Sequence, residues 1–562
     1  MFGSPPDSST IKQWEEAGAS LATALGHYLH LSLNLGVTAL KYGTPPNYLA
    51  TRIDSALQTL HVSLDQQVTQ ARSTLAHTRN RIVCSINRLP NEILPEIFLH
   101  VIFPDSDLDS PPMKKRITTM YRSLYDLISV CSEWKKIILA RGYFWSIIPI
   151  TDLTLSTDRS SCTTRRILES SSGTDLHLAA VLDYMPHGQN DLNYLSEHAS
   201  RVQSINIMTK SRFVIIPILD QFRQLDSSGK LSEISINYRE PFHPTGLPGE
   251  FDYIFLPRST EQELFKELLA RLSIVRLSGS PLSWDGVTFS HRLVELELRD
   301  FSWGYDIALS GFLAALPPAT QLQNLKIISV ETCPYLRTSQ STMTRTKISL
   351  PSLQNLVLRD LYYNTFHYLL MSLTSHSHRL TLHLTNKAFQ IRRLGASEPE
   401  DVFAQTVVDL FRGVTAGALW LSGDRHDPWM SPEDLWELLN AMPGLDTLVM
   451  DDCDYDLDYS EMLERPSNSD KFTFPWLKTM QFTRARIRSE DAFKSMVETY
   501  SNSLERMELG ACIGNGSEFS NSHGPVEEDE DIAIWLQERV PEFELINPLY
   551  TPPEFRTLEW EL

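Results

Sequence analysis

Residues 452–458 carry the pattern closest to a metal site, because four aspartates alternate there with other residues. Their spacing matches the first four ligand positions of a calcium-binding loop. Leu457, however, stands where the sharp turn of that loop needs glycine, and Leu463 stands where a bidentate glutamate belongs. We therefore interpret the segment as a turn after the Leu448/Met450 strand, and we expect no calcium there.

Other arrangements that could do chemistry are weaker. His376, His378 and His383 lie close together in the sequence but lack a further ligand at metal spacing. The sequence contains no phosphate loop of the Gly-x-x-x-x-Gly-Lys-Ser/Thr kind, no Gly-x-Ser-x-Gly elbow and no His-Glu-x-x-His motif. We therefore expect no catalytic residue, no metal and no cofactor, and the chain is not predicted to be an enzyme. A triad assembled from residues far apart in the sequence remains the enzymatic alternative.

Length, composition and charge are typical of a soluble interaction protein. At 562 residues the chain exceeds one ordinary core and should divide or repeat. Its content of 42% apolar and 21% charged residues is that of a globular protein, and a net charge of -20 argues against binding a nucleic acid backbone. The six cysteines lie far apart without a Cys-x-x-Cys pair, which favours a reducing compartment, cytoplasmic or nuclear.

The elements that would position functional side chains are most regular beyond residue 150. The pattern Leu-x-x-Leu-x-Leu, with related apolar residues, returns about every 20 to 30 residues, and amphipathic helical patterns lie between its copies. Ser431 and Ser489 can cap two of these helices. Its copies begin at Leu176, Val202, Leu231, Leu272, Leu293, Leu322, Leu353, Leu382, Leu419, Leu445, Leu477 and Leu504. Strand then helix at this period indicates a leucine-rich-repeat-like α/β solenoid, with a doubly wound α/β domain as the alternative.

Charged side chains alternate with the apolar positions of these strands. Because the apolar residues point into the stack, the intervening residues should line the concave face of a parallel sheet. A mixture of both signs suits the selection of a protein partner, although an unused face must also be polar to stay soluble. The candidate substrate-binding residues are Glu295, Glu297, Arg299, Lys326, Arg359, Asp360, Asp451, Arg484 and Arg506.

The first 85 residues are predicted to form a helical arm. Residues 17–40 carry no formal charge, but glycines and polar residues interrupt them and favour an amphipathic helix over a membrane span. Residues 50–83 contain no glycine or proline and repeat apolar side chains at steps of three or four. This seam predicts either an antiparallel pair with residues 11–40 or a coiled coil through which chains self-associate.

Residues 86–150 contain the most apolar helical unit of the chain. Pro90 suits the first position of a helix, and Pro95 suits the start of a second one. One broad apolar face is expected from Ile93, Leu94, Ile97 and Phe98. A further helix is predicted over 127–138, and the rings of Phe144 and Trp145 close the unit. So small a unit cannot bury all these side chains, so part of the surface should belong to a partner.

These residues resemble an F-box. Leu-Pro-x-Glu-Ile-Leu-x-x-Ile-Phe at 89–98, Val-Cys-x-x-Trp at 130–134 and Phe-Trp-x-x-Ile at 144–148 occur in the order of that motif. Two departures are the long gap between its first two parts and the acidic Glu133 before Trp134. A long helix that runs directly into the motif also makes the chain similar to F-box proteins of mushroom-forming fungi.

The resemblance implies a function in protein recognition. F-boxes dock on the Skp-type adaptor of SCF-type cullin ubiquitin ligases, while the rest of the chain binds the substrate. By this resemblance the chain would hold an unknown protein target near the ubiquitin-conjugating enzyme and do no chemistry itself. The implied adaptor-facing and supporting residues are Leu89, Pro90, Ile93, Leu94, Ile97, Phe98, Val130, Cys131 and Trp134. Trp145 is expected in the core of the unit, and the alternative is a leucine-rich-repeat scaffold or receptor with a vestigial F-box.

These interpretations divide the chain into four parts. They are a helical arm at 1–85, an F-box at 86–150, a leucine-rich-repeat-like solenoid at 151–512, and an acidic and Pro-rich C-terminal cap or tail at 513–562. A short closing helix is predicted from Ile532 to Val540. The expected partners are the Skp-type adaptor, the cullin through it, and a protein substrate. Neither a nucleic acid nor a membrane is expected as a partner.

Overall fold

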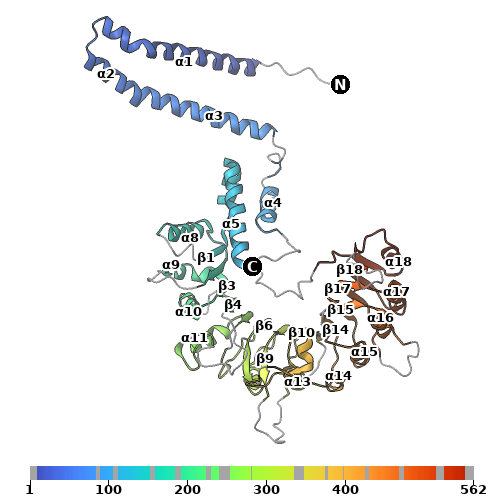
Figure 1. Cartoon of the computed structure of the whole chain (residues 1–562). Helices are drawn as coiled ribbons and strands as arrows, with labels where there is room; N and C mark the ends of the chain where they lie inside the picture. The colour runs from blue at the N-terminus through green and yellow to red at the C-terminus, as the bar shows by residue number, and fades with distance from the viewer. Residues whose placement is uncertain are drawn as a thin grey trace. The chain divides into compact units, whose positions relative to one another are not determined.

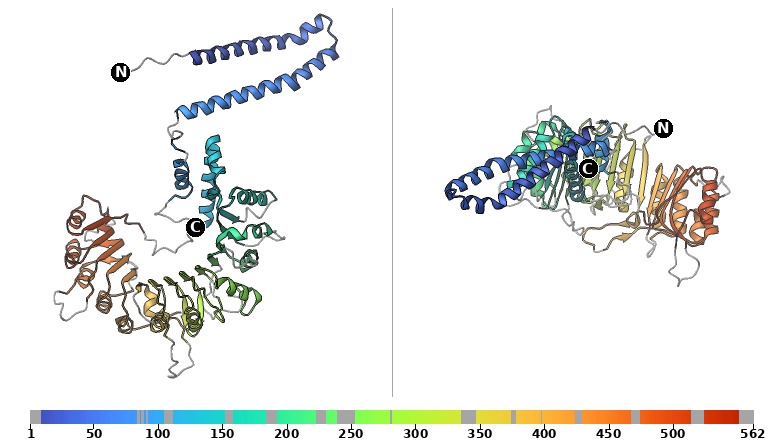
Figure 2. Two further views of the ribbon diagram at one scale, coloured as in Figure 1. Left: turned by 180° about the vertical axis from the view of Figure 1, so that it is seen from behind. Right: turned by 90° about the horizontal axis from the view of Figure 1, so that it is seen from above.

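The chain folds into N-terminal helices followed by a large parallel sheet with helices, a mixed α and β architecture (Figures 1 and 2). The computed structural model describes residues 9–83, 86, 89–90, 92–104, 112–151, 158–183, 192–222, 230–238, 253–279, 282–334, 347–373, 378–396, 398–423, 429–466, 474–513 and 524–550. Two compact units are present, Met1–Glu96 and Ile97–Leu562. Each is described by itself below.

The first unit is a hairpin of long helices. Helix α1 (Ser9–Lys41) is followed by a returning helix made of α2 (Pro46–Ser55), a π-helical segment (Ala56–His61) and α3 (Val62–Val83). The turn forms at Gly43, whose positive φ of 80° suits glycine. A hydrogen bond of 3.2 Å between Tyr28 Oη and His61 Nε2 joins the two arms. The hairpin is therefore the antiparallel pair, one of the two arrangements predicted for these residues.

The helices that follow begin and end at other residues than predicted. Helix α4 (Ile93–Ile102) starts after Pro90, whose carbonyl accepts from the N–H of Ile93 at 3.0 Å, and Pro95 lies in its first turn. The sequence predicts one helix over 127–138. Instead, α5 (Met113–Val130) and α6 (Ser132–Leu139) are separated at Cys131, whose backbone is extended with φ −159° and ψ 167°. A 3₁₀ turn (Gly142–Trp145) leads into the sheet.

One sheet of 16 strands organises the second unit, and all but β19 run parallel to their neighbours. Its strands are β1 (Ile147–Thr151), β2 (Leu176–Leu182), β3 (Val202–Thr209), β4 (Glu233–Tyr238), β5 (Ile274–Ser278), β6 (Glu295–Arg299), β8 (Asn324–Ile328), β10 (Asn355–Arg359), β11 (Arg379–Leu384), β14 (Ala418–Ser422), β15 (Thr447–Asp451), β16 (Asp454–Tyr455), β17 (Thr479–Ile487), β18 (Arg506–Ile513), β19 (Gly524–Pro525) and β20 (Glu542–Leu545). Each copy of the apolar pattern contributes one of these strands, which confirms the strand predictions. Two small separate sheets pair β7 (Ser302–Tyr305) with β9 (Glu331–Cys333) and β12 (Gln390–Ile391) with β13 (Glu400–Asp401).

Helices follow most of the strands and lie along one face of the sheet (Figure 1). They are α8 (Asp158–Ser170), α9 (Asn193–Ser196), α10 (Arg212–Asp220), α11 (Thr260–Leu269), α12 (Ala308–Ala315), α13 (Tyr363–Ser372), α14 (Ala404–Arg412), α15 (Pro432–Asn440), α16 (Leu457–Leu463), α17 (Glu490–Glu498) and α18 (Asp531–Arg539), with 3₁₀ turns at Ala199–Arg201 and Asn386–Phe389. Two predicted caps are confirmed, since Ser431 Oγ accepts from the N–H of Asp434 at 3.1 Å and Ser489 Oγ from that of Ala492 at 3.4 Å. The predicted closing helix is α18.

Alternation along the strands separates a core face from a polar face. In β6, Leu296 and Leu298 are buried, whereas Glu295 and Glu297 remain partly exposed. The register aligns Glu297 with Arg276 of β5 and with Lys326 of β8. These intervening residues therefore share one side of the sheet, called the polar face below.

A repeated backbone corner follows several strands. Gly279, Asp300, Ser329, Asp360 and Asp452 all have positive φ. The N–H of each donates to a backbone carbonyl of the next strand in the sheet, at 2.9 to 3.1 Å. At the first of these corners a Cβ would lie 1.7 Å from a backbone oxygen of β4, so only glycine fits. The corner continues the hydrogen-bond ladder beyond the strand ends.

Helix α5 covers the beginning of the polar face. A buried cluster joins Met113, Ile117, Ala179, Val181 and Met208, and Tyr121 and Ile147 pack against it. The Tyr121 hydroxyl also donates to the Ile147 carbonyl at 2.5 Å. The register continues the row of Val181 through Met208 as far as Arg299 in β6. Ala179, Val181 and Met208 are thus buried on this face beneath α5, and the acidic and basic side chains of the face begin with Glu233 of β4.

Candidate docking surfaces

The candidate adaptor-facing residues at the start of the motif are mostly exposed. Leu89 is 37% exposed and Ile93 46% exposed, and Pro90 is exposed as well. Leu94, on the same helix as Ile93, is only 4% exposed. A partner can therefore reach Leu89 and Ile93 directly, whereas Leu94 supports the helix from within.

The adaptor-facing candidates later in the motif also divide into exposed and buried residues. Phe98 is 1% exposed, and its ring lies 4.8 Å from the ring of Trp134 and 6.5 Å from that of Phe144, measured between centroids. Val130, at the end of α5, is 56% exposed. Ile97, Cys131 and Trp134 are partly exposed. The structure thus brings Phe98 and Trp134 together in a core and leaves Val130 accessible.

Trp145 anchors this helical segment to the sheet. It is 4% exposed, and its Nε1 donates to the carbonyl of Ile138 at 3.1 Å. Its ring lies edge-on to Tyr125 at 6.4 Å, and β1 begins two residues later. The prediction that Trp145 belongs to the core of the segment is confirmed.

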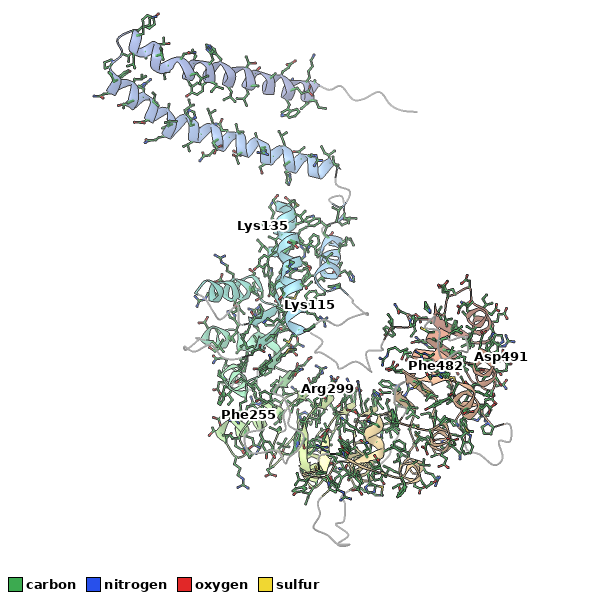
Figure 3. The ribbon with its side chains drawn as sticks, in the orientation of Figure 1. Lys115, Lys135, Phe255, Arg299, Phe482 and Asp491 are labelled. Carbon is green, nitrogen blue, oxygen red and sulfur yellow. The ribbon has the colours of Figure 1, made fainter. Side chains whose placement is uncertain are left out.

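Helices α5 and α6 are basic within an acidic chain. Residues 112–141 contain seven lysines and arginines but two acidic residues, against a net charge of -20 for the whole chain. Lys115, Arg122 and Lys135 are exposed, and Figure 3 labels the two lysines. Such a local excess of positive charge attracts an acidic protein surface and speeds encounter with it.

Four candidate substrate-binding residues form one ion-pair network on the polar face. Lys326 Nζ lies 3.6 Å from a carboxylate oxygen of Glu295 and 3.6 Å from one of Glu297. Glu295 also pairs with Arg276 at 2.9 Å, and Glu297 with Arg299 at 2.6 Å. The Lys326 side chain is 37% exposed, but those of the two glutamates and Arg299 are at most 17% exposed. The network is therefore largely satisfied within the sheet, and Lys326 is its most accessible charge.

Asp360 belongs to a second cluster, which the sequence analysis missed. Its carboxylate accepts from Ser329 Oγ at 2.8 Å, Thr385 Oγ1 at 2.7 Å and Lys387 Nζ at 2.8 Å. Burial by itself would raise the pKa of Asp360, but Lys387 and these hydrogen bonds hold that pKa below its usual value. Burial raises the pKa of Glu331, whose Oε1 lies 3.9 Å from Lys387 Nζ. The available sequence signal was an aspartate just after an apolar strand. Arg359, the last residue of that strand, is partly exposed.

The expectation that Asp451 lies on an accessible face is wrong. Asp451 is 1% exposed, because Arg484 from the next corner folds over the end of its strand. Its carboxylate accepts from Thr483 Oγ1 at 2.8 Å and from Arg484 Nε at 2.9 Å. This pair is part of the framework of β15 and β17. Arg506 does remain exposed, and it pairs with Glu508 at 2.6 Å.

A cavity of about 180 Å³ is lined by three of the four aspartates at calcium spacing, Asp452, Asp454 and Asp456. It is lined by Leu421, Gly423, Trp429, Met430, Met450, Asp452, Cys453, Asp454, Asp456, Tyr459 and Arg488. Asp456 caps α16 by accepting from the N–H of Tyr459 at 2.9 Å, and Asp454 pairs with Arg488. The predicted turn over 452–458 is therefore wrong, since β16 and the start of α16 occupy most of it. Among the described residues, no group of three or more His, Cys, Asp or Glu side chains could hold a metal.

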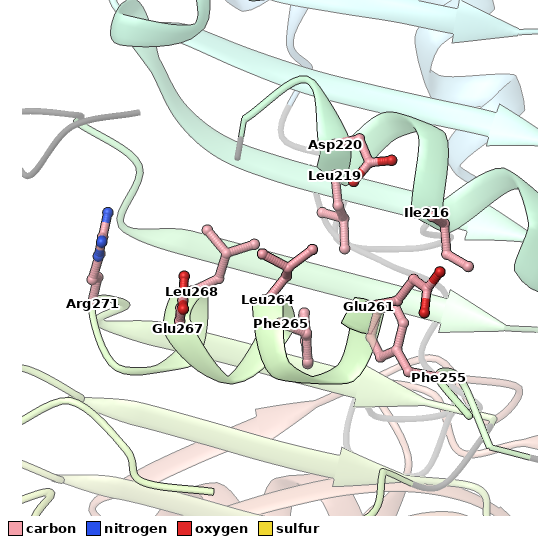
Figure 4. Close-up of a pocket in the computed structure, with 10 residues that line it drawn as sticks. All are labelled: Ile216, Leu219, Asp220, Phe255, Glu261, Leu264, Phe265, Glu267, Leu268 and Arg271. Atoms are coloured by element: carbon pink, nitrogen blue, oxygen red, sulfur yellow. The ribbon is translucent and has the colours of Figure 1, made fainter. Parts of the chain in front are cut away.

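A smaller cavity, of about 40 Å³, lies between α10 and α11 (Figure 4). Ile216 and Leu219 line it from α10, and Leu264 and Leu268 line it from α11. Pockets for small molecules are typically about 300 Å³ or larger. This gap between two helices is therefore too small for such a ligand.

Comparison with known proteins gives no identification. No protein-family model matches the sequence, and no curated protein is significantly similar to it. Within the described residues, no helix is long and apolar enough to cross a membrane.

Proposed function

We propose that the chain is the substrate-recognition subunit of an SCF-type cullin ubiquitin ligase, with an F-box at 86–150. The observation that carries this proposal is the exposure of aliphatic side chains at motif positions. Ile93 is 46% exposed and Val130 56% exposed, while Leu94 and Phe98 of the same motif are buried. Exposed apolar residues beside a packed core are typical of a surface that binds a protein. The partner is a Skp-type adaptor, and through it the cullin.

The second unit is, by this proposal, a leucine-rich-repeat-like solenoid that binds the substrate. Its strand order supports this choice over a doubly wound domain, because the strands from β1 to β18 neighbour one another in chain order. A doubly wound sheet would reverse its strand order at a switch point. The charged rows from β5 onward, with Lys326 and Arg359 among them, are the surface offered to a protein substrate.

In the proposed ligase subunit, the packing of α5 on the sheet links the F-box to the substrate-binding strands. Met113 and Ile117 are buried against β2 and β3, and each buried aliphatic side chain contributes about 1.5–3 kcal/mol. Helix α5, which belongs to the proposed F-box, is thereby joined to the sheet within the second unit. By this proposal a bound target is brought near the conjugating enzyme, and this proximity is the subunit's whole contribution to rate. It would act in the cytoplasm or the nucleus.

The direct test replaces the exposed aliphatic residues by aspartate. Ile93→Asp with Val130→Asp buries two charges in a desolvated contact, so capture of adaptor and cullin from an extract should fall at least about tenfold. The matched control is Met371→Asp with Ile534→Asp, which changes side chains that are 49% and 45% exposed on α13 and α18. The control should capture both proteins as the wild type does. Undiminished capture by the first double variant would refute the docking proposal.

A further inference from the structure

The helical arm exposes more apolar surface than its own hairpin covers. Among the described residues, 36 large apolar side chains are exposed, and 20 of them lie within 9–83. Helix α1 has no buried residue at all. An apolar surface of this density on so short a segment marks a contact with something else.

One stripe of α1 faces the returning helix. At about 100° per residue, Leu21, Leu25, Tyr28, Leu35 and Ala39 fall on one side of the helix. Tyr28 and Ala39 are the two residues of α1 that are partly buried. The Tyr28 ring lies 5.8 Å from the ring of His61 on the returning helix. This side is therefore the one that the hairpin covers.

A second stripe lies next to the first and is largely exposed to solvent. It consists of Leu29, Leu33, Val37 and Leu40, which are 60%, 74%, 77% and 53% exposed. The two stripes together span about 200° of the helix circumference, whereas an apolar stripe facing one neighbour is about 100° wide. Helix α1 therefore needs a second neighbouring helix, and the hairpin supplies one.

We propose that this neighbour is the same stripe of a second copy of the chain, in an antiparallel pair. The spacing is nearly palindromic, so Leu29 would face the partner's Leu40, and Leu33 the partner's Val37. A two-fold axis requires such a self-complementary surface. Residues 17–40 contain no Asp, Glu, Lys or Arg, so nothing repels a second copy.

Other occupants fit the stripe less well. A different protein would be selected largely through charge complementarity, and this stretch offers no charges for that purpose. A helix that lies on a lipid surface carries Lys and Arg on its polar side. The rest of the circumference of α1 has Thr23, His27, Asn34, Thr38 and the exposed Leu31, none of which is Lys or Arg.

The resulting dimer is a four-helix bundle in which two α1 helices pack together, each flanked by its own returning helix. It would carry two F-box segments and two polar faces in one particle. Two adaptors and two parts of a substrate could then be bound together, which raises avidity for multivalent targets. The dimer does not depend on the proposed ligase function.

The test measures the mass of the full-length chain in solution by light scattering and sedimentation. The wild type should have twice the chain mass of 64.1 kDa. Leu33→Glu with Val37→Glu should reduce the mass to that of one chain without loss of helix content by circular dichroism. Asn34→Glu with Thr38→Glu adds the same two charges outside both stripes of α1, and this variant should remain a dimer.

Three outcomes would overturn the proposal. One is a wild-type chain with the mass of one copy over concentrations from about 1 to about 50 µM. Another is a dimer that survives Leu33→Glu with Val37→Glu, because the contact would then lie elsewhere. The third is a single-copy chain that floats with neutral phosphatidylcholine vesicles, which would assign the stripe to a lipid surface.

Discussion

Asp360 and Lys387 form a partly buried pair that links the ends of the middle strands. The carboxylate joins the segments that follow β8, β10 and β11, because it accepts from Ser329, Thr385 and Lys387. The two side chains are 21% and 26% exposed. A pair this well shielded is strengthened by its surroundings, and removal of one partner leaves the other charge with its full cost of burial.

We predict that Lys387→Met lowers the free energy of unfolding by about 2–3 kcal/mol near neutral pH. Without the lysine, burial dominates and raises the pKa of Asp360 above its ordinary value of 3.8. A folded-state pKa above the unfolded value means that stability returns as the pH falls through it. The deficit in urea unfolding should therefore be smaller near pH 5 than near pH 7. In the wild type the lowered pKa of Asp360 keeps its contribution constant over that window.

Lys230→Met is the control for this experiment. Lys230 pairs with Asp175 on the surface, where the two side chains are 56% and 43% exposed. Its removal should cost less than about 1 kcal/mol at both pH values. A Lys387→Met deficit that does not change between the two pH values would contradict the role given to Asp360.

The roles of single residues on the polar face were only partly predictable. Strand alternation was enough to put Glu297 and Lys326 on one face, because period two depends on backbone geometry alone. The burial of Asp451 was not predictable, since it depends on Arg484, which lies 33 positions away in the sequence. The same limit applies to Asp360, whose partner Lys387 arrives from the next connection along the sheet.

The corner after β5 determines how closely its backbone approaches β4. At Gly279, φ is 89° and an added Cβ would lie 1.7 Å from the carbonyl oxygen of Tyr238. Gly173 has a similar φ of 79°, but nothing lies within 4 Å of the position of its Cβ. The two glycines separate the cost of backbone strain from the cost of a steric clash.

We predict that Gly279→Ala destabilises the chain by about 3 kcal/mol or more, because strain and overpacking add. Gly173→Ala should cost only about 1 kcal/mol, the strain alone. Thermal unfolding of the two variants measures the difference directly. Equal losses would mean that the corner can widen, and that the close approach to β4 is not required.

The starts of helices were predicted well where a local cap sets them. Helix breaks and helix packing that depend on tertiary contacts were predicted poorly. Ser431 and Ser489 act as predicted caps because capping involves residues three positions apart. The break at Cys131 was missed because no glycine or proline marks it. The contact of α5 with β2 and β3 was missed as well, although the nearly continuous apolar run of β2 indicates a strand buried on both faces.

Across the second unit, each strand buries its apolar residues against its neighbours in chain order. A cut within the sheet should therefore weaken strands on both sides of it. We predict that a chain ending at Leu421 loses several degrees in melting temperature and tends to aggregate, because it exposes one edge of β14 and the apolar surface behind it. A chain ending at Tyr550 is the control and should melt like the wild type. Unchanged melting of the shorter chain would indicate independent domains.

The order of the strands was predictable from the sequence because the apolar pattern recurs with a similar spacing each time. The two-unit division and the exposed second stripe of α1 were not, since both depend on which surfaces find partners.

The most direct measurement is isothermal titration of the purified full-length chain with a purified Skp-type adaptor. We predict one adaptor per chain with a dissociation constant of about 1 µM or tighter. Binding should weaken with added salt, and Lys115→Glu with Lys135→Glu should reduce that salt dependence, because these exposed lysines attract an acidic partner. No detectable binding at about 50 µM adaptor, with a correctly folded chain by circular dichroism, would contradict the account.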